Sequence, residues 1–147
     1  MTAGGRPLAD ASNDPDPIYL EWEEALALFA EIKGLSIEAA LRELRDEGLL
    51  RSAMARPQNA AHYAGADLAE QAASLLWGIA ENQPFIDGNK RTALVVTLTF
   101  LELNAYAVDL SEDERVELVT EVAAGLEVKD VAERLRVRLR PLDQAEI

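Results

Sequence analysis

Residues 87–91 place a carboxylate, a glycine, an amide and two cations next to one another, directly before a long apolar segment. If that segment is a helix, these groups stand at its N-terminus, where unpaired N–H groups and the helix dipole favour anions. Lys90 and Arg91 add positive charge suited to phosphate. Asp87 offers the hard oxygen ligand that Mg²⁺ takes beside nucleotide phosphates. The stretch therefore predicts a phosphate site, in which Gly88 would allow close backbone approach.

The same stretch carries no general base. The chain has one histidine, His62, and it lies well before the stretch in the sequence. We expect His62 to serve a surface or packing role. Taken alone, Asp-Gly-Asn before a helix is also typical of an ordinary turn and helix cap. The residue types thus leave two alternatives open, a phosphate site and a plain helix start.

The elements around this stretch are predicted to be helices, because apolar residues recur three and four positions apart. Local signals mark several ends: Gly34 as a C-terminal glycine, Ser36 as an N-cap, and Ser111 with Glu114 as a capping box. The predicted helices span residues 20–32, 36–48, 49–55 (before Pro57), 66–81, 89–104 and 111–125, with a loop at 57–65.

The predicted fold class is a single all-α domain. Residues 89–104 are apolar almost all round, so we expect them to form the central and most buried helix. Residues 128–142 keep helical spacing, but cations alternate with apolar residues at 134–140 as in a strand; we expect a helix. The predicted organisation is a flexible N-terminal tail at 1–17, the domain at 18–140 and a C-terminal tail at 141–147.

Composition excludes several classes of protein. A net charge of −13 argues against direct binding of nucleic acid. No run of apolar residues is long enough to predict a membrane span. The 147 residues include no cysteine, which excludes a disulfide framework and suits a cytoplasmic protein.

Residues 82–93 read Asn-Gln-Pro-Phe-Ile-Asp-Gly-Asn-Lys-Arg-Thr-Ala. This string resembles the signature of the Fic/Doc family, His-x-Phe-x-Asp/Glu-Gly-Asn-x-Arg, and most closely its death-on-curing (Doc) toxin branch. The resemblance extends upstream to residues 48–58 and covers most of 18–140. It implies a helical Fic/Doc-type domain in which the buried central helix follows the motif.

The resemblance also implies roles for single residues. Phe85 matches the family's loop anchor, and Asp87 matches the residue that binds Mg²⁺ on nucleotide phosphates. Gly88 and Asn89 match the pair that shapes the phosphate nest, and the Asn89 amide can donate to a phosphate oxygen. Lys90 and Arg91 match the cations that neutralise phosphates during transfer. The implied cofactors are ATP, or another nucleotide, and Mg²⁺.

Two positions depart from the family pattern. The second arginine of Fic AMP-transferases is Leu94 here, which favours the Doc branch. The family's catalytic histidine is Gln83, and an amide has no usable basicity near neutral pH. Three explanations stay open: an engineered or selected inactivation, a natural member that only binds, or a different group acting as base.

The resemblance implies a toxin domain of a toxin–antitoxin system that transfers a phosphoryl group to a protein hydroxyl, inactive or weakened by Gln83. Its implied target is similar to elongation factor Tu. AMP transfer, as in Fic enzymes, and a non-enzymatic nucleotide- or protein-binding module are the alternatives. The chain contains no match to the inhibitory helix of some Fic proteins, so we expect control by a separate antitoxin.

Overall fold

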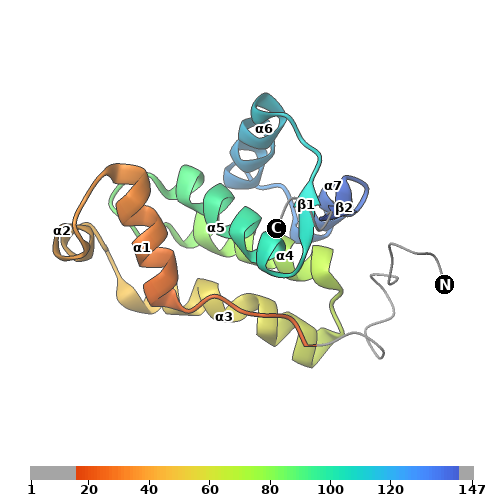
Figure 1. The fold of residues 1–147 in the computed structure, drawn as a ribbon, viewed down its shortest axis with the longest axis horizontal. Coiled ribbons are helices and arrows are strands. Elements are labelled where there is room, and N and C mark those ends of the chain that lie inside the picture. The colour runs from red at the N-terminus through yellow and green to blue at the C-terminus, as the bar shows by residue number, and fades with distance from the viewer. Residues whose placement is uncertain (1–15, 143–147) are drawn as a thin grey trace.

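The structure, a computed structural model, describes residues 16–142 (Figure 1). This part of the chain forms seven helices and two short strands, so the predicted all-α fold is confirmed. The helices are α1 (Trp22–Lys33), α2 (Ile37–Arg42), α3 (Glu47–Ala64), α4 (Leu68–Asn82), α5 (Asn89–Leu103), α6 (Glu112–Ala123) and α7 (Val128–Arg136), and the strands are β1 (Tyr106–Val108) and β2 (Leu139–Pro141).

Helix α4 occupies the middle of the fold, where it packs against α3, α5, α6 and α7. Helices α1 and α2 lie together at one end of the molecule, and α6, α7 and the two strands lie toward the other (Figure 1). The chain passes from α4 to α5 at the end that carries α1 and α2. The sequence stretch with the candidate chemistry is therefore placed beside these two helices.

Local helix signals act as predicted. Gly34 ends α1 with φ 68°, a left-handed conformation that glycine adopts without steric cost. The Ser36 side chain accepts a hydrogen bond from the Ala39 amide and begins α2. Ser111 and Glu114 form the capping box of α6. These signals involve neighbours within four residues, which is why the sequence alone reveals them.

The second predicted helix ends earlier than expected, at Arg42. Leu44 instead forms an isolated antiparallel bridge with Phe85, between α4 and α5. The Asp46 side chain then caps the next helix, α3. Pairing with a distant segment thus overrides the local helical spacing around Leu44.

The predicted loop at 57–65 is wrong, because α3 continues through Pro57. A proline inside a helix removes one backbone hydrogen bond and costs about 3 kcal/mol. Close packing against α4 offsets this cost. A Cβ atom at Gly78 of α4 would lie 2.6 Å from Arg56 Cδ and 3.3 Å from Ala53 Cα, so the absence of a side chain at position 78 favours the close approach of α3. The residues that α3 buries are Leu50, Ala53, Met54 and Pro57.

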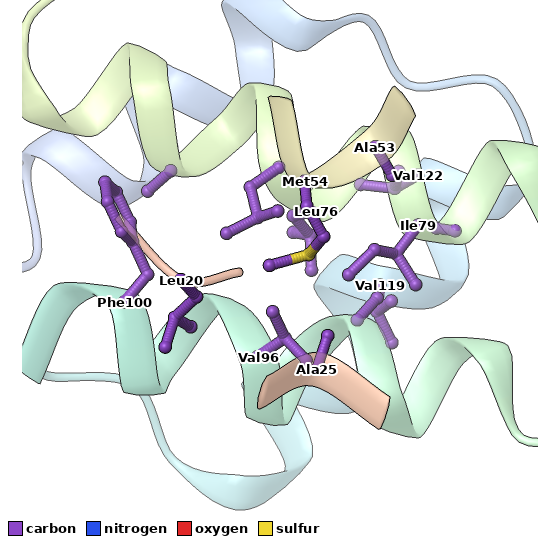
Figure 2. Close-up of a cluster of buried hydrophobic side chains, with 14 of the residues drawn as sticks. Leu20, Ala25, Ala53, Met54, Leu76, Ile79, Val96, Phe100, Val119 and Val122 are labelled. Carbon is purple, nitrogen blue, oxygen red and sulfur yellow. The ribbon is translucent and has the colours of Figure 1, made fainter. Parts of the chain in front are cut away.

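The central helix after the motif is part of the core, but the most buried helix is α4. Ten of the 15 residues of α4 are buried, compared with six of the 15 in α5. Neighbouring helices surround α4, whereas Leu94 and Leu98 of α5 are only partly buried. Figure 2 shows side chains from several helices meeting in the core, among them Met54, Leu76 and Val96.

Both patterns seen in residues 128–142 occur in the structure. Helix α7 ends at Arg136, and β2 then pairs antiparallel with β1, with Arg140 opposite Ala107. The prediction of a continuous helix is therefore wrong beyond Arg136, and strand β1 was not predicted. A strand of three residues depends on its pairing partner more than on its own periodicity, so the sequence pattern gave it no clear signal.

The described structure continues through Leu142, whose N–H donates to the Ala105 carbonyl at 2.9 Å. Residues 1–15 of the predicted N-terminal tail and residues 143–147 of the predicted C-terminal tail lie outside the described residues. None of the described helices combines the length and apolar character that crossing a bilayer would require.

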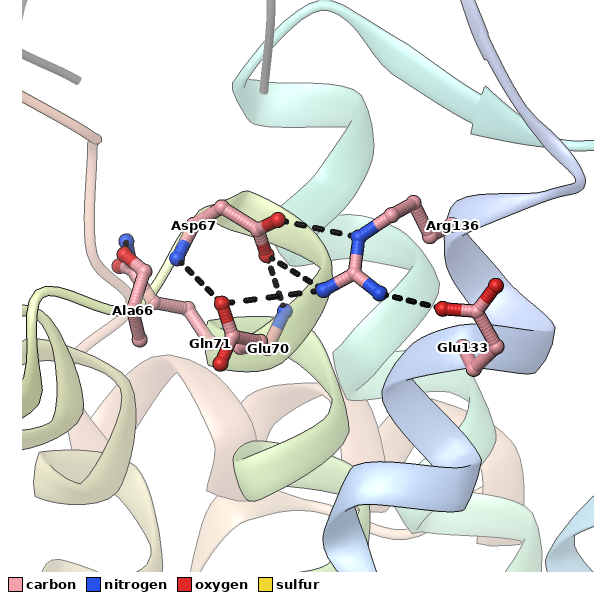
Figure 3. A network of polar contacts seen from close by, with 6 residues as sticks. All are labelled: Ala66, Asp67, Glu70, Gln71, Glu133 and Arg136. Atoms are coloured by element: carbon pink, nitrogen blue, oxygen red, sulfur yellow. Dashed lines mark hydrogen bonds and ion pairs between the residues drawn. The ribbon is translucent and has the colours of Figure 1, made fainter. Parts of the chain in front are cut away.

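An ion-pair network joins the N-terminus of α4 to α7 (Figure 3). Asp67, the N-cap of α4, is 7% exposed and accepts hydrogen bonds from Arg136 at 3.0 and 3.3 Å. Arg136 also donates to Glu133 at 2.6 Å and lies 3.7 Å from Glu70. The hydrogen bond to Asp67 raises the pKa of Arg136. The Asp67 carboxylate and the Arg136 guanidinium thus neutralise each other.

Candidate functional site

Residues 83–88, here called the motif loop, join α4 to α5. Gln83 is exposed and has φ 49° and ψ 61°, and its N–H donates to the Ile79 carbonyl at 3.1 Å. It therefore ends α4 in the left-handed conformation that glycine usually provides. A non-glycine residue there carries backbone strain of order 1 kcal/mol. The position that matches the family's histidine is held in a specific, costly conformation.

Residues 43–46, here called the clamp segment, hold the motif loop from the outside. The Arg45 Nε donates to the Gln83 carbonyl at 2.9 Å, and its terminal nitrogen donates to the Asn82 carbonyl at 2.8 Å. The Arg45 backbone N–H donates to the Pro84 carbonyl at 2.7 Å. These contacts satisfy carbonyls that the end of α4 leaves without helical partners. One side chain thus fixes the backbone on both sides of the strained residue.

Phe85 holds the motif loop from the inside. Its ring is 1% exposed and stacks on Phe29 of α1, with centroids 3.9 Å apart and planes 7° from parallel. The Asn89 side chain accepts from the Phe85 N–H at 3.0 Å and donates to the Phe85 carbonyl at 2.9 Å. The Asn89 amide group is thus engaged with the loop backbone. A contact from this side chain to phosphate stays a prediction.

The N-terminus of α5 is open to an anion. Gly88 is its N-cap with φ 85°, no side chain caps it, and its first turn contains no acidic residue. The N–H groups of residues 89–91 have no helical acceptor at such a position. Lys90 and Arg91 are exposed, and neither forms an ion pair with any residue from 16 to 142. Dipole, amides and two cations therefore act together toward an incoming anion.

The Asp87 carboxylate stands beside this anion seat. Its side chain is 82% exposed, and Oδ2 lies 3.3 Å from Lys33 Nζ. The hydrogen bond from Lys33, followed by that from the Gly88 N–H, lowers the pKa of Asp87. No group of three or more metal-ligating side chains occurs among residues 16–142. A single carboxylate fits Mg²⁺, which commonly takes one or two carboxylates and completes its shell with phosphate and water oxygens.

The only histidine lies far from the motif loop. His62 is an exposed residue of α3 that packs edge-on against the Tyr63 ring at 4.6 Å. Together with Asp67 it lines an open pocket of about 890 Å³, to which no motif-loop residue contributes. Asp67 and Gln83 cap opposite ends of α4, and the 15 residues between them span about 22 Å at the usual helical rise. His62 therefore cannot act as the base at position 83.

Comparisons with known proteins agree with this geometry. The model of the Fic/DOC family matches residues 20–101. The chain belongs to this family. It is also 42% identical to Toxin Doc of Mycolicibacterium smegmatis (strain ATCC 700084 / mc(2)155) over 111 residues, which make up 71% of this chain and 80% of that protein.

The family match covers α1 to α4 and most of α5, and therefore the whole motif loop, the clamp segment and the aromatic anchor Phe85. Sequence reasoning grouped Gln83 and residues 85–91 because they are near neighbours in the chain, and their roles stay predictions. It missed Lys33 and Arg45, which reach the motif loop from 54 and 38 residues away. No local pattern marks either residue as a contact of the motif loop, because both contacts depend on how distant segments meet in the fold.

Proposed function

We propose that this chain is a Doc-like toxin domain of a toxin–antitoxin system that transfers the terminal phosphoryl group of ATP to a protein hydroxyl, in a form weakened by Gln83. One observation carries the chemistry: beside an exposed carboxylate lies a helix N-terminus without a side-chain cap, with two cations that form no ion pair among residues 16–142. The identity with Toxin Doc supports the toxin role, and a toxin of this kind is expected to have a separate antitoxin.

The proposed binding uses the first turn of α5. Phosphate oxygens would accept hydrogen bonds from the backbone N–H groups of residues 89–91, while Lys90 and Arg91 would neutralise their charge. Gly88 leaves the approach to these amides free of a side chain. Phe85 and the Asn89 amide hold the backbone in place before the nucleotide arrives. This preorganisation lowers the cost of binding.

Asp87 would hold Mg²⁺ together with phosphate and water oxygens. When bound, the ion would neutralise phosphate charge beyond what Lys90 and Arg91 provide. The exposure of Asp87 supports this role, because a side chain that is 82% exposed can be reached by an ion from solvent even though Oδ2 also contacts Lys33.

The transfer itself needs a proton acceptor. The hydroxyl oxygen of the target would form a bond to the terminal phosphorus, the bond to the bridging oxygen would break, and ADP would leave with the electron pair. The hydroxyl proton must pass to a base, and the Gln83 amide cannot take it. Loss of a general base typically lowers the rate by about 10²–10⁴. The binding groups are present, so the weakness is proposed to lie in the chemical step.

The proposed target is a protein similar to elongation factor Tu, and the proposed compartment is the cytoplasm. The target is implied by the resemblance to Doc toxins, and the compartment by the absence of cysteine from the sequence. The strongly acidic chain has a net charge of −13, which disfavours nucleic acid as the direct partner.

The decisive experiment restores the base. Gln83→His should raise phosphoryl transfer to cell-extract proteins by at least about a hundredfold over the parent chain, the lower limit of typical general-base effects. It should also slow growth when expressed without an antitoxin. Label from the terminal phosphate of ATP should reach protein, and label from the α-phosphate should not.

Each other outcome favours a different function. Transfer of the α-label would identify an AMP-transferase, although Leu94 is partly buried against the core and supplies no second phosphate cation. Nucleotide binding without transfer in Gln83→His would favour a binding module. Gln83→Asn is the matched control, since it alters the side chain without adding a base. An Asp87→Ala change in the Gln83→His background should abolish the gain.

A further inference from the structure

Lys33, the last residue of α1, reaches into the proposed site from another helix. Its Nζ lies 3.3 Å from Asp87 Oδ2, and its side chain is 27% exposed, far less than that of Asp87. The ammonium also stands 5.9 Å from the centre of the Phe29 ring. A Cβ atom built on Gly88 would lie 3.7 Å from Lys33 Cδ and 3.8 Å from its Nζ. The side chain therefore lies along the entrance to α5.

This ion pair differs from an ordinary surface pair in its position. An exposed pair contributes little to stability. Here, however, the ammonium lies on Oδ2 of the carboxylate that would hold the metal under the proposed function, and it is the cation nearest to that oxygen among the described ion pairs. Lys90 and Arg91, although adjacent in sequence, form no ion pair with Asp87. The counter-ion of Asp87 comes from α1.

Two cations cannot share Asp87 without cost. A divalent ion placed at this carboxylate would repel an ammonium a few ångströms away, and the repulsion is only partly screened. Phosphate oxygens arriving with the metal would remove the repulsion, since they offer the ammonium a new negative partner. Lys33 and Asp87 together thus disfavour binding of the metal alone and favour binding of the metal together with phosphate.

We propose that Lys33 is a positioning cation of the nucleotide site: it neutralises Asp87 in the free protein and turns to phosphate when Mg²⁺ and nucleotide bind together. This inference rests on the proposed nucleotide site. It gives the site a preference for the metal–nucleotide complex over the bare metal. Lys33 does not touch the reacting atoms and acts through Asp87 and the bound phosphates.

The test uses Mn²⁺ in place of Mg²⁺, followed by paramagnetic broadening of the Asp87 and Gly88 amide resonances. Without nucleotide, Lys33→Met should bind Mn²⁺ about tenfold more tightly than the parent chain, because removal of the ammonium removes the repulsion. At saturating Mn²⁺, the same variant should bind ADP several-fold more weakly, because a phosphate partner is lost. Lys33→Arg should restore both properties.

Lys90→Met is the matched control. This variant removes a cation of the proposed phosphate site, so it should weaken ADP binding. Because Lys90 forms no ion pair with Asp87, the affinity for Mn²⁺ in the absence of nucleotide should not change. If Lys33→Met binds Mn²⁺ as tightly as the parent does, and ADP as tightly as the parent does, the inference is overturned. Lys33 would then only link α1 to the motif loop at the surface. Absence of ADP binding in every variant would count instead against the proposed function. Thermal unfolding of Lys33→Met shows whether the fold is intact.

Discussion

At its N-terminal end, α4 presents a buried carboxylate, Asp67, which Arg136 neutralises at 3.0 Å. At its C-terminal end, the motif loop leads to two exposed cations, Lys90 and Arg91, without an ion-pair partner among residues 16–142. The first end is closed on itself by side-chain contacts (Figure 3). The second is held by one aromatic stack and by the Arg45 and Asn89 side chains, which bond its backbone and leave the charges of Lys90 and Arg91 without an ion-pair partner among the described residues. Charges that are satisfied within the protein stabilise the fold, and charges that are left unsatisfied are available to a ligand.

Removal of the aromatic anchor should have the largest effect. Phe85→Ala empties a buried position stacked on Phe29, so the free energy of unfolding should fall by about 3–5 kcal/mol. Chemical denaturation measures the loss. Ile86→Ala is the control, because its side chain is 67% exposed and the change should stay within about 0.5 kcal/mol. A small loss at Phe85 would show that the loop is held mainly from outside.

Removal of the Asp67–Arg136 ion pair at the N-terminal end of α4 should have the second largest effect on stability. Arg136→Ala leaves the Asp67 carboxylate buried without its guanidinium partner, and the loss should be about 2 kcal/mol, typical of a hydrogen bond to a charged group. Nucleotide affinity should not change. Lys129→Ala, at an exposed ion pair of 3.8 Å, provides a surface control. A loss of nucleotide affinity in Arg136→Ala would break the separation between the two ends.

The left-handed conformation of Gln83 predicts a gain in stability when the residue is replaced by glycine. Gln83→Gly should be more stable than Gln83→Ala by about 1 kcal/mol, since only glycine adopts the left-handed conformation freely. Thermal unfolding of the two variants compares them directly. Equal stabilities would mean that the loop relaxes when the side chain is shortened, and that Arg45 does not enforce the conformation.

The free cations should contribute little to stability. Lys90→Ala and Arg91→Ala should each change the free energy of unfolding by no more than about 0.5 kcal/mol. Each should nevertheless weaken binding of ADP with Mg²⁺, because it removes a charge at the anion seat. Calorimetric titration checks the affinity. A marked loss of stability in either variant would reveal a structural role that the exposed side chains do not suggest.

The smallest expected effect is on the pH dependence of the free energy of unfolding. The hydrogen bond from Arg134 lowers the pKa of Glu121 below its usual value. A carboxylate with a depressed pKa in the folded state contributes stability above its unfolded pKa, and this contribution disappears as the pH falls through the folded pKa. Glu121→Gln should therefore lower the free energy of unfolding slightly at neutral pH and leave it almost unchanged at acid pH, so that stability depends less on pH. Denaturation at neutral and acid pH tests this.

The sequence predicted the features that depend on near neighbours. Gly34, Ser36 and Ser111 mark helix ends through contacts within one turn, and the motif is a single uninterrupted string. Features that depend on distant partners were missed. The helix around Pro57 exists because α4 packs against it, and β1 exists because β2 pairs with it.

The candidate site divides in the same way. Residues 85–91 could be proposed as site residues from their types and order, whereas Lys33 and Arg45 could not, because their contacts arise from the path of the chain. The orientation of Asn89 toward Phe85 was also beyond the sequence, since an asparagine at a helix start can point to the loop or to a ligand.

Gly78 has a consequence beyond the packing of two helices. It sets the distance between α3 and α4, and the clamp segment is the stretch of chain that leads directly into α3. The Asn82 side chain bonds the Leu49 carbonyl at 3.2 Å, so the two helices are also fastened next to the motif loop. A side chain at position 78 would crowd Arg56 and Ala53 of α3, the helix that the clamp segment leads into. The absence of a side chain at position 78 thus keeps α3 close to α4, and the clamp segment that precedes α3 contacts the motif loop that follows α4.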